Sequence, residues 1–481
     1  MNRRMVLYII GQMIKIESLL LLLPFIVSLI YHENKSTLGF AVTIVAAITS
    51  GLMCTLISNP RSRVIYAKEG FVIVSIAWIV LSAFGALPFV ISGEIPSYID
   101  AFFETVSGFT TTGSSILTDV ESMSRSCLFW RSFTNWIGGM GVLVLIMAIN
   151  PNVSDRSIHI MRAEMPGPIV GKLVPRTKDT AKILYIIYMG ITIAEIIFLL
   201  FGGMSLFEAI VHSFSNAGTG GFGIKADSIG GYSPYIQWVI TVFMLIFGVN
   251  FNIYFLLIIK RMGSALKSSE LMTYFGMIAA SVAAITINIY PLYKSVEESF
   301  RLASFQVATV ITTTGFATAD FNLWPTFSKI ILFILMFSGG CAGSTSGGFK
   351  ISRILILIKA IKRELSHLLH PRSVKVIRLE GKKLDEQTIH SVLTYLAVYS
   401  LSIIAVLLVL SIEPFDVATT ISAAVSSFNN IGPGFNAIGP VESFAAFSPF
   451  SKLVLSASML LGRLEIFPLL LAFSPSTWIK K

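Results

Sequence analysis

The chain has 481 residues, of which 54% are hydrophobic and 13% are charged, and its mean hydropathy is +0.78. This composition excludes a soluble globular domain of the same size and predicts repeated membrane-spanning helices. The three cysteines, Cys54, Cys127 and Cys341, are scattered through apolar runs, a pattern that fits neither a disulfide framework nor a metal cluster.

Two apolar runs come first, and they predict spanning helices over about 5–31 and 37–58, within an N-terminal segment of residues 1–66. The first run follows a basic N-terminus in the way a signal peptide does. However, it contains Lys15 and Glu17 and lacks a small-residue cleavage site. We therefore interpret it as a retained helix.

Four similar units follow, each with a helix, a short amphipathic stretch, a polar loop and a second helix. We predict them at residues 67–150, 180–262, 268–360 and 389–475, with a basic segment at 361–388. The long helices are expected at 70–92 and 127–149, 183–203 and 235–259, 271–291 and 327–358, and 390–411 and 450–472.

The short stretches, at 98–109, 205–215, 297–311 and 415–429, cannot cross a bilayer. Each joins two spanning helices on the same side, so each is expected to enter the membrane and return as a re-entrant helix and loop. Unpaired backbone at that depth is tolerated only where protein or water surrounds it. The short helices would also direct their negative C-terminal dipoles at a common axis, which favours a cation.

The polar loops carry one recurring motif. Ser107–Gly113 reads S-G-F-T-T-T-G, Thr312–Gly315 repeats its last four residues, and weaker copies end near Gly218 and Gly432. The copies lie about 100 residues apart, a period too long for a soluble repeat array. A single T-T-T-G would be an ordinary loop. Four copies at matching places predict a cation path lined by backbone carbonyls.

Two of the four loops allow more than one alignment. The run Gly218-Thr219-Gly220-Gly221 offers three glycines, and Gly432-Pro433-Gly434 offers two. We align Gly218 and Gly432 with Gly113, because this keeps the spacing from the preceding Ser-x-Phe pattern.

Charge sets the predicted topology. With an N-terminus placed in the cytoplasm, 26 of the 36 lysines and arginines fall on the cytoplasmic side, together with the C-terminus and segment 361–388. Acidic residues such as Glu104, Asp227 and Glu442 fall on the outer side and predict an acidic vestibule. Ordinary topology bias thus explains the net charge of +10 without a nucleic-acid partner.

At this point the chain resembles the membrane subunit of Trk-type potassium uptake systems, in the Trk/Ktr/HKT superfamily. The resemblance implies an all-α polytopic protein of a bacterial inner membrane, with four helix–pore helix–helix repeats around one pore plus two N-terminal helices. It also implies a homodimer, K⁺ as the transported ion, and cytosolic nucleotide-binding (TrkA-like) regulatory subunits. The implied filter residues are Thr111, Thr112, Gly113, Ala217, Gly218, Thr219, Gly220, Thr313, Thr314, Gly315, Asn430, Ile431 and Gly432.

A glycine-rich stretch interrupts the second helix of the third unit. Five glycines in ten residues should break a helix, since each costs about 1 kcal/mol relative to alanine. Close helix packing is the alternative explanation. The resemblance implies an intramembrane gate below the filter, made of Gly339, Gly340, Gly343, Ser344, Thr345, Ser346, Gly347 and Gly348.

Arg463 lies about ten residues from either end of the last apolar run, which is far for its side chain to reach water. Buried arginines in membranes are costly and mark functional sites. The resemblance implies that Arg463 faces the gate, and the alternative is a structural ion pair. Glu465, two residues on, is expected to face elsewhere.

No nucleotide-binding motif or catalytic constellation is found in the sequence, so neither an enzyme nor a cofactor is expected. The alternative function is a secondary ion-coupled transporter with discontinuous helices. Such proteins are usually built from inverted repeats, whereas these four units are parallel.

Overall fold

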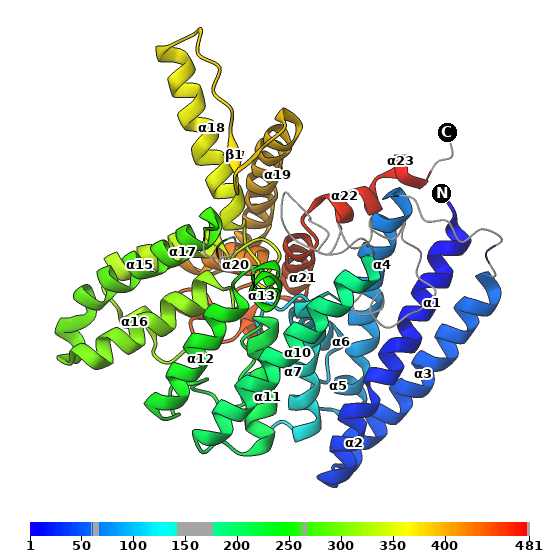
Figure 1. Ribbon diagram of the computed structural model, residues 1–481. Helices are drawn as coiled ribbons and strands as arrows, with labels where there is room; N and C mark the ends of the chain where they lie inside the picture. The colour runs from blue at the N-terminus through cyan, green and yellow to red at the C-terminus, as the bar shows by residue number, and fades with distance from the viewer. Residues whose placement is uncertain (59, 61–66, 142–176, 261–262, 264–266, 479–481) are drawn as a thin grey trace.

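The computed structural model describes residues 1–58, 60, 67–141, 177–260, 263 and 267–478. The described residues are helical apart from loops and one antiparallel hairpin of β1 (Arg378–Leu379) and β2 (Lys382–Lys383). The predicted all-α class is confirmed (Figure 1).

The N-terminal pair packs along one flank of the molecule (Figure 1). It consists of α1 (Arg3–Leu20) and α2 (Leu22–Ile30), which together make one span, and α3 (Asn34–Ser58). The helices approach closely where Gly11 faces Gly51, because a Cβ atom at Gly11 would lie 2.9 Å from the carbonyl oxygen of Gly51. Small residues at such crossings are typical of membrane helices.

The four units have the following bounds. The first contains α4 (Ala67–Gly85), α5 (Leu87–Ser92), α6 (Tyr98–Phe109) and α7 (Arg125–Gly139), and the second contains α10 (Thr177–Phe201), α11 (Leu206–Gly218), α12 (Pro234–Phe247) and α13 (Phe251–Ile258). The third contains α15 (Ser269–Tyr293), α16 (Val296–Ile311), α17 (Thr326–Ser338) and α18 (Ile351–Leu369). The fourth contains α19 (Glu386–Leu410), α20 (Val417–Asn429), α21 (Pro449–Arg463), α22 (Phe467–Phe473) and α23 (Pro475–Trp478).

The short helices α6, α11, α16 and α20 begin in the same way. Each has an N-cap side chain that accepts a hydrogen bond from a backbone N–H in the first turn. The four capping residues are Ser97, Ser205, Ser295 and Asp416. Four independent caps at the same position fix where each short helix starts.

The second long helix of each unit is shorter than predicted. Instead of one helix over 235–259, α12 and α13 meet at an angle of 90°. The expected helix at 450–472 is broken after Arg463, where Glu465 and Ile466 adopt positive φ values of 56° and 65°. The run 327–358 divides into α17 and α18. That third break falls at the glycine-rich stretch, as expected, whereas apolar composition continues on both sides of the other two breaks, so hydropathy did not reveal their positions.

The helix expected at 127–149 ends at Gly139 in the structure. Residues 142–149, the boundary at 150, and the basic residues Arg61, Arg63, Arg156, Arg162, Lys172, Arg176 and Arg261 lie outside the described residues. Within the described chain, six helices are long and apolar enough to span a membrane, or seven if α12 and α13 count as one.

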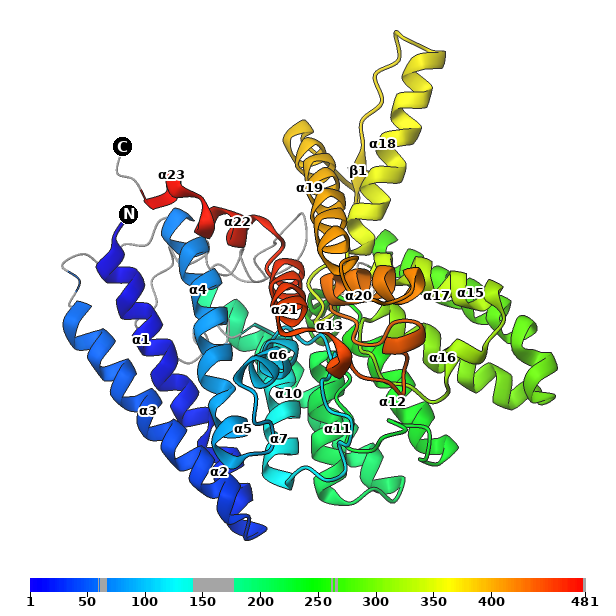
Figure 2. The same cartoon turned by 180° about the vertical axis from the view of Figure 1, so that it is seen from behind.

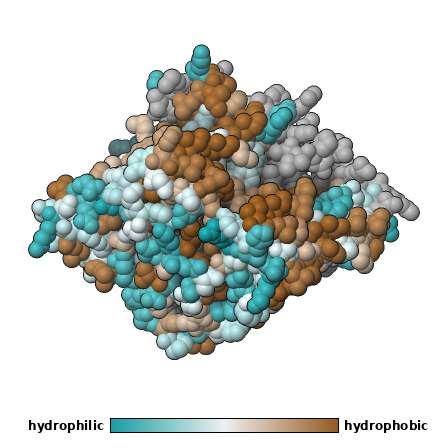
Figure 3. Space-filling view, turned by 90° about the horizontal axis from the view of Figure 1, so that it is seen from below, coloured by the Kyte–Doolittle hydropathy of each residue, from teal (hydrophilic) through white to brown (hydrophobic). Residues whose placement is uncertain are grey.

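The basic segment 361–388, which was predicted to be a loop, contains the end of a helix and a short hairpin. Helix α18 continues to Leu369 and projects from the body, and the β1–β2 hairpin follows it back to α19 (Figure 1). The hairpin, the N-terminus and α23, the last described helix, all lie at the same end of the molecule, as the reverse view also shows (Figure 2). The opposite end has polar residues over much of its central surface (Figure 3).

Candidate functional site

The four polar loops share one backbone conformation. In each, a non-glycine residue with φ near 55° is followed two residues later by a glycine with positive φ. The first set is Thr111, Thr219, Thr313 and Asn430, and the second is Gly113 (79°), Gly221 (71°), Gly315 (91°) and Gly432 (102°). Left-handed backbone is unfavourable for residues with a Cβ atom, so four matching occurrences indicate a common structural requirement.

The hydrogen bonds repeat with the same register. The residue before each of these glycines donates its N–H to a carbonyl five residues earlier in the preceding helix. The four bonds are Thr112 to Ser107 (2.8 Å), Gly220 to Ser215 (2.8 Å), Thr314 to Thr309 (2.8 Å) and Ile431 to Ser426 (3.0 Å). Gly221 is therefore the equivalent of Gly113, and the alignment on Gly218 was wrong. In this register Thr219 matches Thr111, but glycines, Gly218 and Gly220, stand where the first loop has its other two threonines.

The four glycines form a closed ring. A Cβ atom on each one would collide with the carbonyl oxygen of the residue before the glycine of the next loop. The distances would be 1.9 Å from Gly113 to Gly220 O, 2.1 Å from Gly221 to Thr314 O, 2.2 Å from Gly315 to Ile431 O, and 2.8 Å from Gly432 to Thr112 O. The loops thus follow one another around an axis at a spacing that excludes side chains at these positions.

A cavity of about 130 Å³ lies over this ring and is lined by all four glycines. Among the described residues, the charged side chains in its lining are Arg131, Lys225 and Glu442. The prediction of an acidic vestibule is therefore wrong for the immediate surroundings of the ring. Most of the outer carboxylates make contacts away from the ring. For example, Asp416 caps a helix, and Asp100 forms an ion pair with Lys452 at 2.6 Å.

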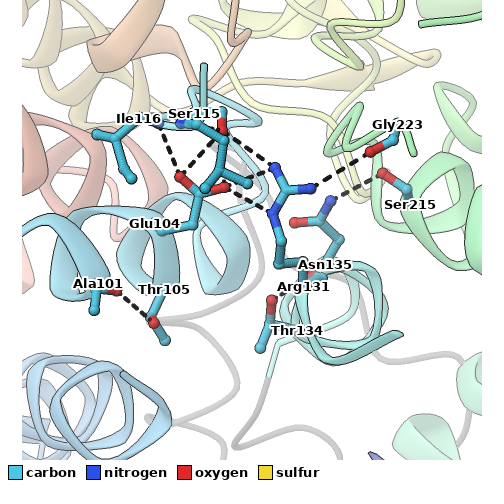
Figure 4. A network of polar contacts seen from close by, with 11 residues as sticks. Ala101, Glu104, Thr105, Ser115, Ile116, Arg131, Thr134, Asn135, Ser215 and Gly223 are labelled. Atoms are coloured by element: carbon cyan, nitrogen blue, oxygen red, sulfur yellow. Dashed lines mark hydrogen bonds and ion pairs between the residues drawn. The ribbon is translucent and has the colours of Figure 1, made fainter. Parts of the chain in front are cut away.

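Behind the first loop lies a buried ion pair that the sequence did not reveal (Figure 4). Glu104 from α6 and Arg131 from α7 lie 2.7 Å apart, with side chains 0% and 3% exposed. Glu104 also accepts hydrogen bonds from the N–H of Ile116 (3.0 Å) and the hydroxyl of Ser115 (3.0 Å). The pair therefore fixes the chain directly after Gly113 to two helices.

The same arginine reaches the second loop. Its guanidinium donates to the carbonyl of Gly223 at 3.4 Å and lies 4.1 Å from the ring centroid of Phe222. On the next turn of α7, Asn135 donates to the hydroxyl of Ser215 at 3.0 Å (Figure 4). Helix α7 thus holds the first and second loops at a fixed separation.

The glycine-rich loop between α17 and α18, residues 339–350, lies against the base of the ring. The N–H of Gly347 donates to the hydroxyl of Thr313 at 2.7 Å. A Cβ atom at Gly347 would lie 2.3 Å from the carbonyl oxygen of Asn429. On its other side the loop contacts the break between α12 and α13, where the N–H of Cys341 donates to the carbonyl oxygen of Gly248 at 3.0 Å.

Arg463 contacts this loop, but from the end of α21 rather than from the middle of a helix. Its guanidinium donates to the carbonyl of Thr345 at 2.7 Å and to the carbonyls of Gly138 and Gly139 at 2.6 Å. The side chain is 8% exposed. Glu465 faces another way, as predicted, and pairs with Arg353. Arg463 therefore links the glycine-rich loop to the end of α7.

Lys350 is one of the 26 basic residues counted on the cytoplasmic side, but it is not a solvated surface charge. It is 1% exposed, adopts a left-handed φ of 78°, and donates from its Nζ to the carbonyl of Ser346. Its position at the end of the glycine-rich loop was the available signal. A lysine there supplies a donor to loop carbonyls that lack helical partners.

Comparisons with known proteins agree over the whole chain. Residues 33–287 and 277–481 match the family model described as TrkH, cation transport protein. The chain is 37% identical over 485 residues to the Trk system potassium uptake protein TrkH of Salmonella typhimurium, covering 99% of this chain and 100% of that protein. It is 35% identical to TrkG of Escherichia coli, with coverage of 99% and 98%. The crystal structure of the potassium transporter TrkH from Vibrio parahaemolyticus matches with a TM-score of 0.88 at 34% identity, covering 100% of both chains.

Proposed function

Because the chain belongs to the TrkH family of cation transport proteins, we propose that it takes up potassium along the axis enclosed by its four glycine loops. The relatives are named potassium uptake proteins, which implies transport of K⁺ rather than catalysis and indicates no cofactor. The resemblance predicted from the repeated motif is confirmed at the level of the family.

The ring of glycines is the observation that carries the proposal. Backbone carbonyls can replace the hydration shell of a cation when several loops present them to one axis. The loop segments Thr111–Gly113, Thr219–Gly221, Thr313–Gly315 and Asn430–Gly432 contain no charged side chain, so binding relies on carbonyl dipoles. Dipoles hold K⁺ without the strong attraction of a carboxylate, which favours passage over retention.

The glycine-rich loop and Arg463 are proposed to close this path below the ring. The loop contacts the base of the third filter loop through Gly347 and Thr313, and Arg463 holds it through Thr345. The positive charge of Arg463 would also repel a cation from an empty path. Because the loop is held by individual hydrogen bonds rather than by helix, it has the character of a segment that can rearrange.

The four loops support a pore over the alternative of a secondary ion-coupled transporter. All four share one register and join in one ring, as parallel repeats would. Inverted repeats would instead place half of such loops at the other face of the protein. The discontinuous helices expected of that alternative are present, at α12–α13 and α17–α18, but here they surround the glycine-rich loop.

The proposal extends to the location and partners of the protein. We assign the protein to the inner membrane of a bacterium, with both termini and the β1–β2 hairpin in the cytoplasm. The basic residues of α18 and the hairpin support this orientation. A homodimer and TrkA-like nucleotide-binding subunits on the cytoplasmic face remain part of the proposal.

Flux through the purified protein in liposomes tests the proposed function. A K⁺ gradient alone is expected to drive uptake of radiolabelled Rb⁺, and an equal Na⁺ gradient is expected to drive much less cation movement. Protein-free liposomes are the control. Uptake that needs an imposed H⁺ or Na⁺ gradient would favour the coupled transporter, and no cation uptake at all would contradict the proposal.

A further inference from the structure

We propose that Glu270 is a positioning residue for the glycine-rich loop, and that Glu380 connects it to the cytoplasmic hairpin. The inference rests on the proposed role of that loop as a gate. It concerns a different set of contacts from those made by Arg463, and it gives the loop a mechanical link to the end of the molecule that carries the termini.

Glu270 joins the two ends of the glycine-rich loop. Its Oε1 accepts a hydrogen bond from the N–H of Ala342 at 2.7 Å, near the start of the loop. The same oxygen accepts from the N–H of Ser352 at 3.1 Å, in the first turn of α18. One carboxylate oxygen therefore bonds both to the first part of the loop and to the helix that follows the loop.

The position suits a carboxylate. Glu270 lies in the first turn of α15, where the helix dipole favours a negative charge, and its side chain is 7% exposed. Hydrogen bonds to an ionised acceptor are roughly twice as strong as neutral ones. A loop so rich in glycine has few side chains to pack, so two such bonds are a large share of what fixes its shape.

Glu380 holds the start of α15 from the cytoplasmic side. It lies at the turn of the β1–β2 hairpin with a φ of 50°. Its Oε1 accepts from the hydroxyl of Ser268 and from the N–H of Glu270, both at 3.1 Å. Because Ser268 is also the N-cap of α15, Glu380 binds the residues that set the direction of the Glu270 side chain.

The hairpin is in turn attached to the projecting helices. Ile377 and Leu379 pack with Ile356 of α18 and with Ile389 and Val392 of α19 in a small separate core. A movement of α18 or the hairpin would therefore displace Glu380. Glu380 contacts the start of α15, and Glu270 in the first turn of α15 contacts the loop. Each step is a direct contact between named groups.

The native Cys341 gives a readout of this arrangement. It lies inside the glycine-rich loop and is 0% exposed, so a small thiol reagent reaches it only when the loop opens. The measurement uses the full-length protein in liposomes with Cys54 and Cys127 replaced by alanine. The rate of Cys341 modification and the basal Rb⁺ uptake are recorded for each variant.

Glu270→Ala is expected to raise the modification rate by about tenfold, because two charge-assisted bonds are lost. Glu270→Gln keeps an acceptor oxygen and should fall between Ala and the wild type. Glu380→Ala is expected to act in the same direction by about threefold. Because the two residues act in series, the double variant should be no more reactive than Glu270→Ala alone. The control is Glu364→Ala, an exposed carboxylate on α18, which should change nothing.

The outcomes separate the inference from the proposed function. If Glu270→Ala leaves Cys341 unreactive while Arg463→Ala raises Rb⁺ uptake, the gate stands and the role of Glu270 is overturned. If Cys341 becomes reactive in Glu270→Ala without any rise in uptake, Glu270 does hold the loop, but the loop is not the gate. If the effects of Glu270→Ala and Glu380→Ala simply multiply in the double variant, the link to the hairpin is overturned.

Discussion

Replacing Gly113 by serine is expected to abolish most of the preference for K⁺ over Na⁺. A Cβ atom at this position would lie 1.9 Å from the carbonyl oxygen of Gly220, and the φ of 79° disfavours any side chain. The two loops must move apart, which widens the ring. We expect the K⁺/Na⁺ flux ratio to fall by about tenfold, equivalent to about 1.4 kcal/mol of differential binding. Competition of K⁺ and Na⁺ with Rb⁺ uptake measures this ratio.

A matched control for this substitution is Gly190→Ser. Gly190 lies in α10, and a Cβ atom there would have no neighbour within 4 Å. The ratio should therefore stay at the wild-type value. An unchanged ratio in both Gly113→Ser and Gly221→Ser would exclude an axial ring as the selective element.

The second large effect concerns stability. Arg131→Met leaves the carboxylate of Glu104 buried without its partner, and loss of one member of a buried ion pair costs about 3–5 kcal/mol. The double variant Glu104→Gln, Arg131→Met removes both charges and should recover much of this loss. Thermal unfolding of the purified protein in detergent, with K⁺ present, compares the three proteins.

The exposed ion pair between Arg363 and Glu386 is the control. It joins α18 to α19 with Glu386 largely in solvent, so Glu386→Gln should leave the unfolding temperature unchanged. Equal unfolding temperatures for wild type and Arg131→Met would show that the Glu104–Arg131 pair does not support the loops.

Local signals in the sequence were sufficient for the parts of the fold that repeat. The short helices were predicted from their length and from the loops that follow them, and their ends carry the Ser and Asp caps that local chemistry favours. The T-T-T-G motif placed Gly113 and Gly315 correctly because threonine and glycine occupy the same backbone positions in both loops. The second loop has Gly218, Gly220 and Gly221 in that stretch, so composition could not select the glycine with the required φ.

The parts that were missed depend on contacts between distant segments. The breaks after Phe247 and Arg463 lie inside apolar runs, and they are stabilised by the glycine-rich loop and its neighbours rather than by local sequence. The sequence alone assigns Glu104 to the outer carboxylates, and its pairing with Arg131 appears only in the structure. Glu270 has no local sequence feature that indicates its role, and Lys350 counts among the basic residues assigned to the cytoplasmic side, whereas the fold buries both against the glycine-rich loop.

Locating a bound cation tests the central claim most directly. Crystals of the protein grown in Rb⁺, a heavier analogue of K⁺, would show its position by anomalous scattering. The account predicts a peak on the axis enclosed by Gly113, Gly221, Gly315 and Gly432, coordinated by backbone carbonyl oxygens of the four loops. Rb⁺ bound elsewhere in the membrane region, with no peak inside this ring, would contradict it.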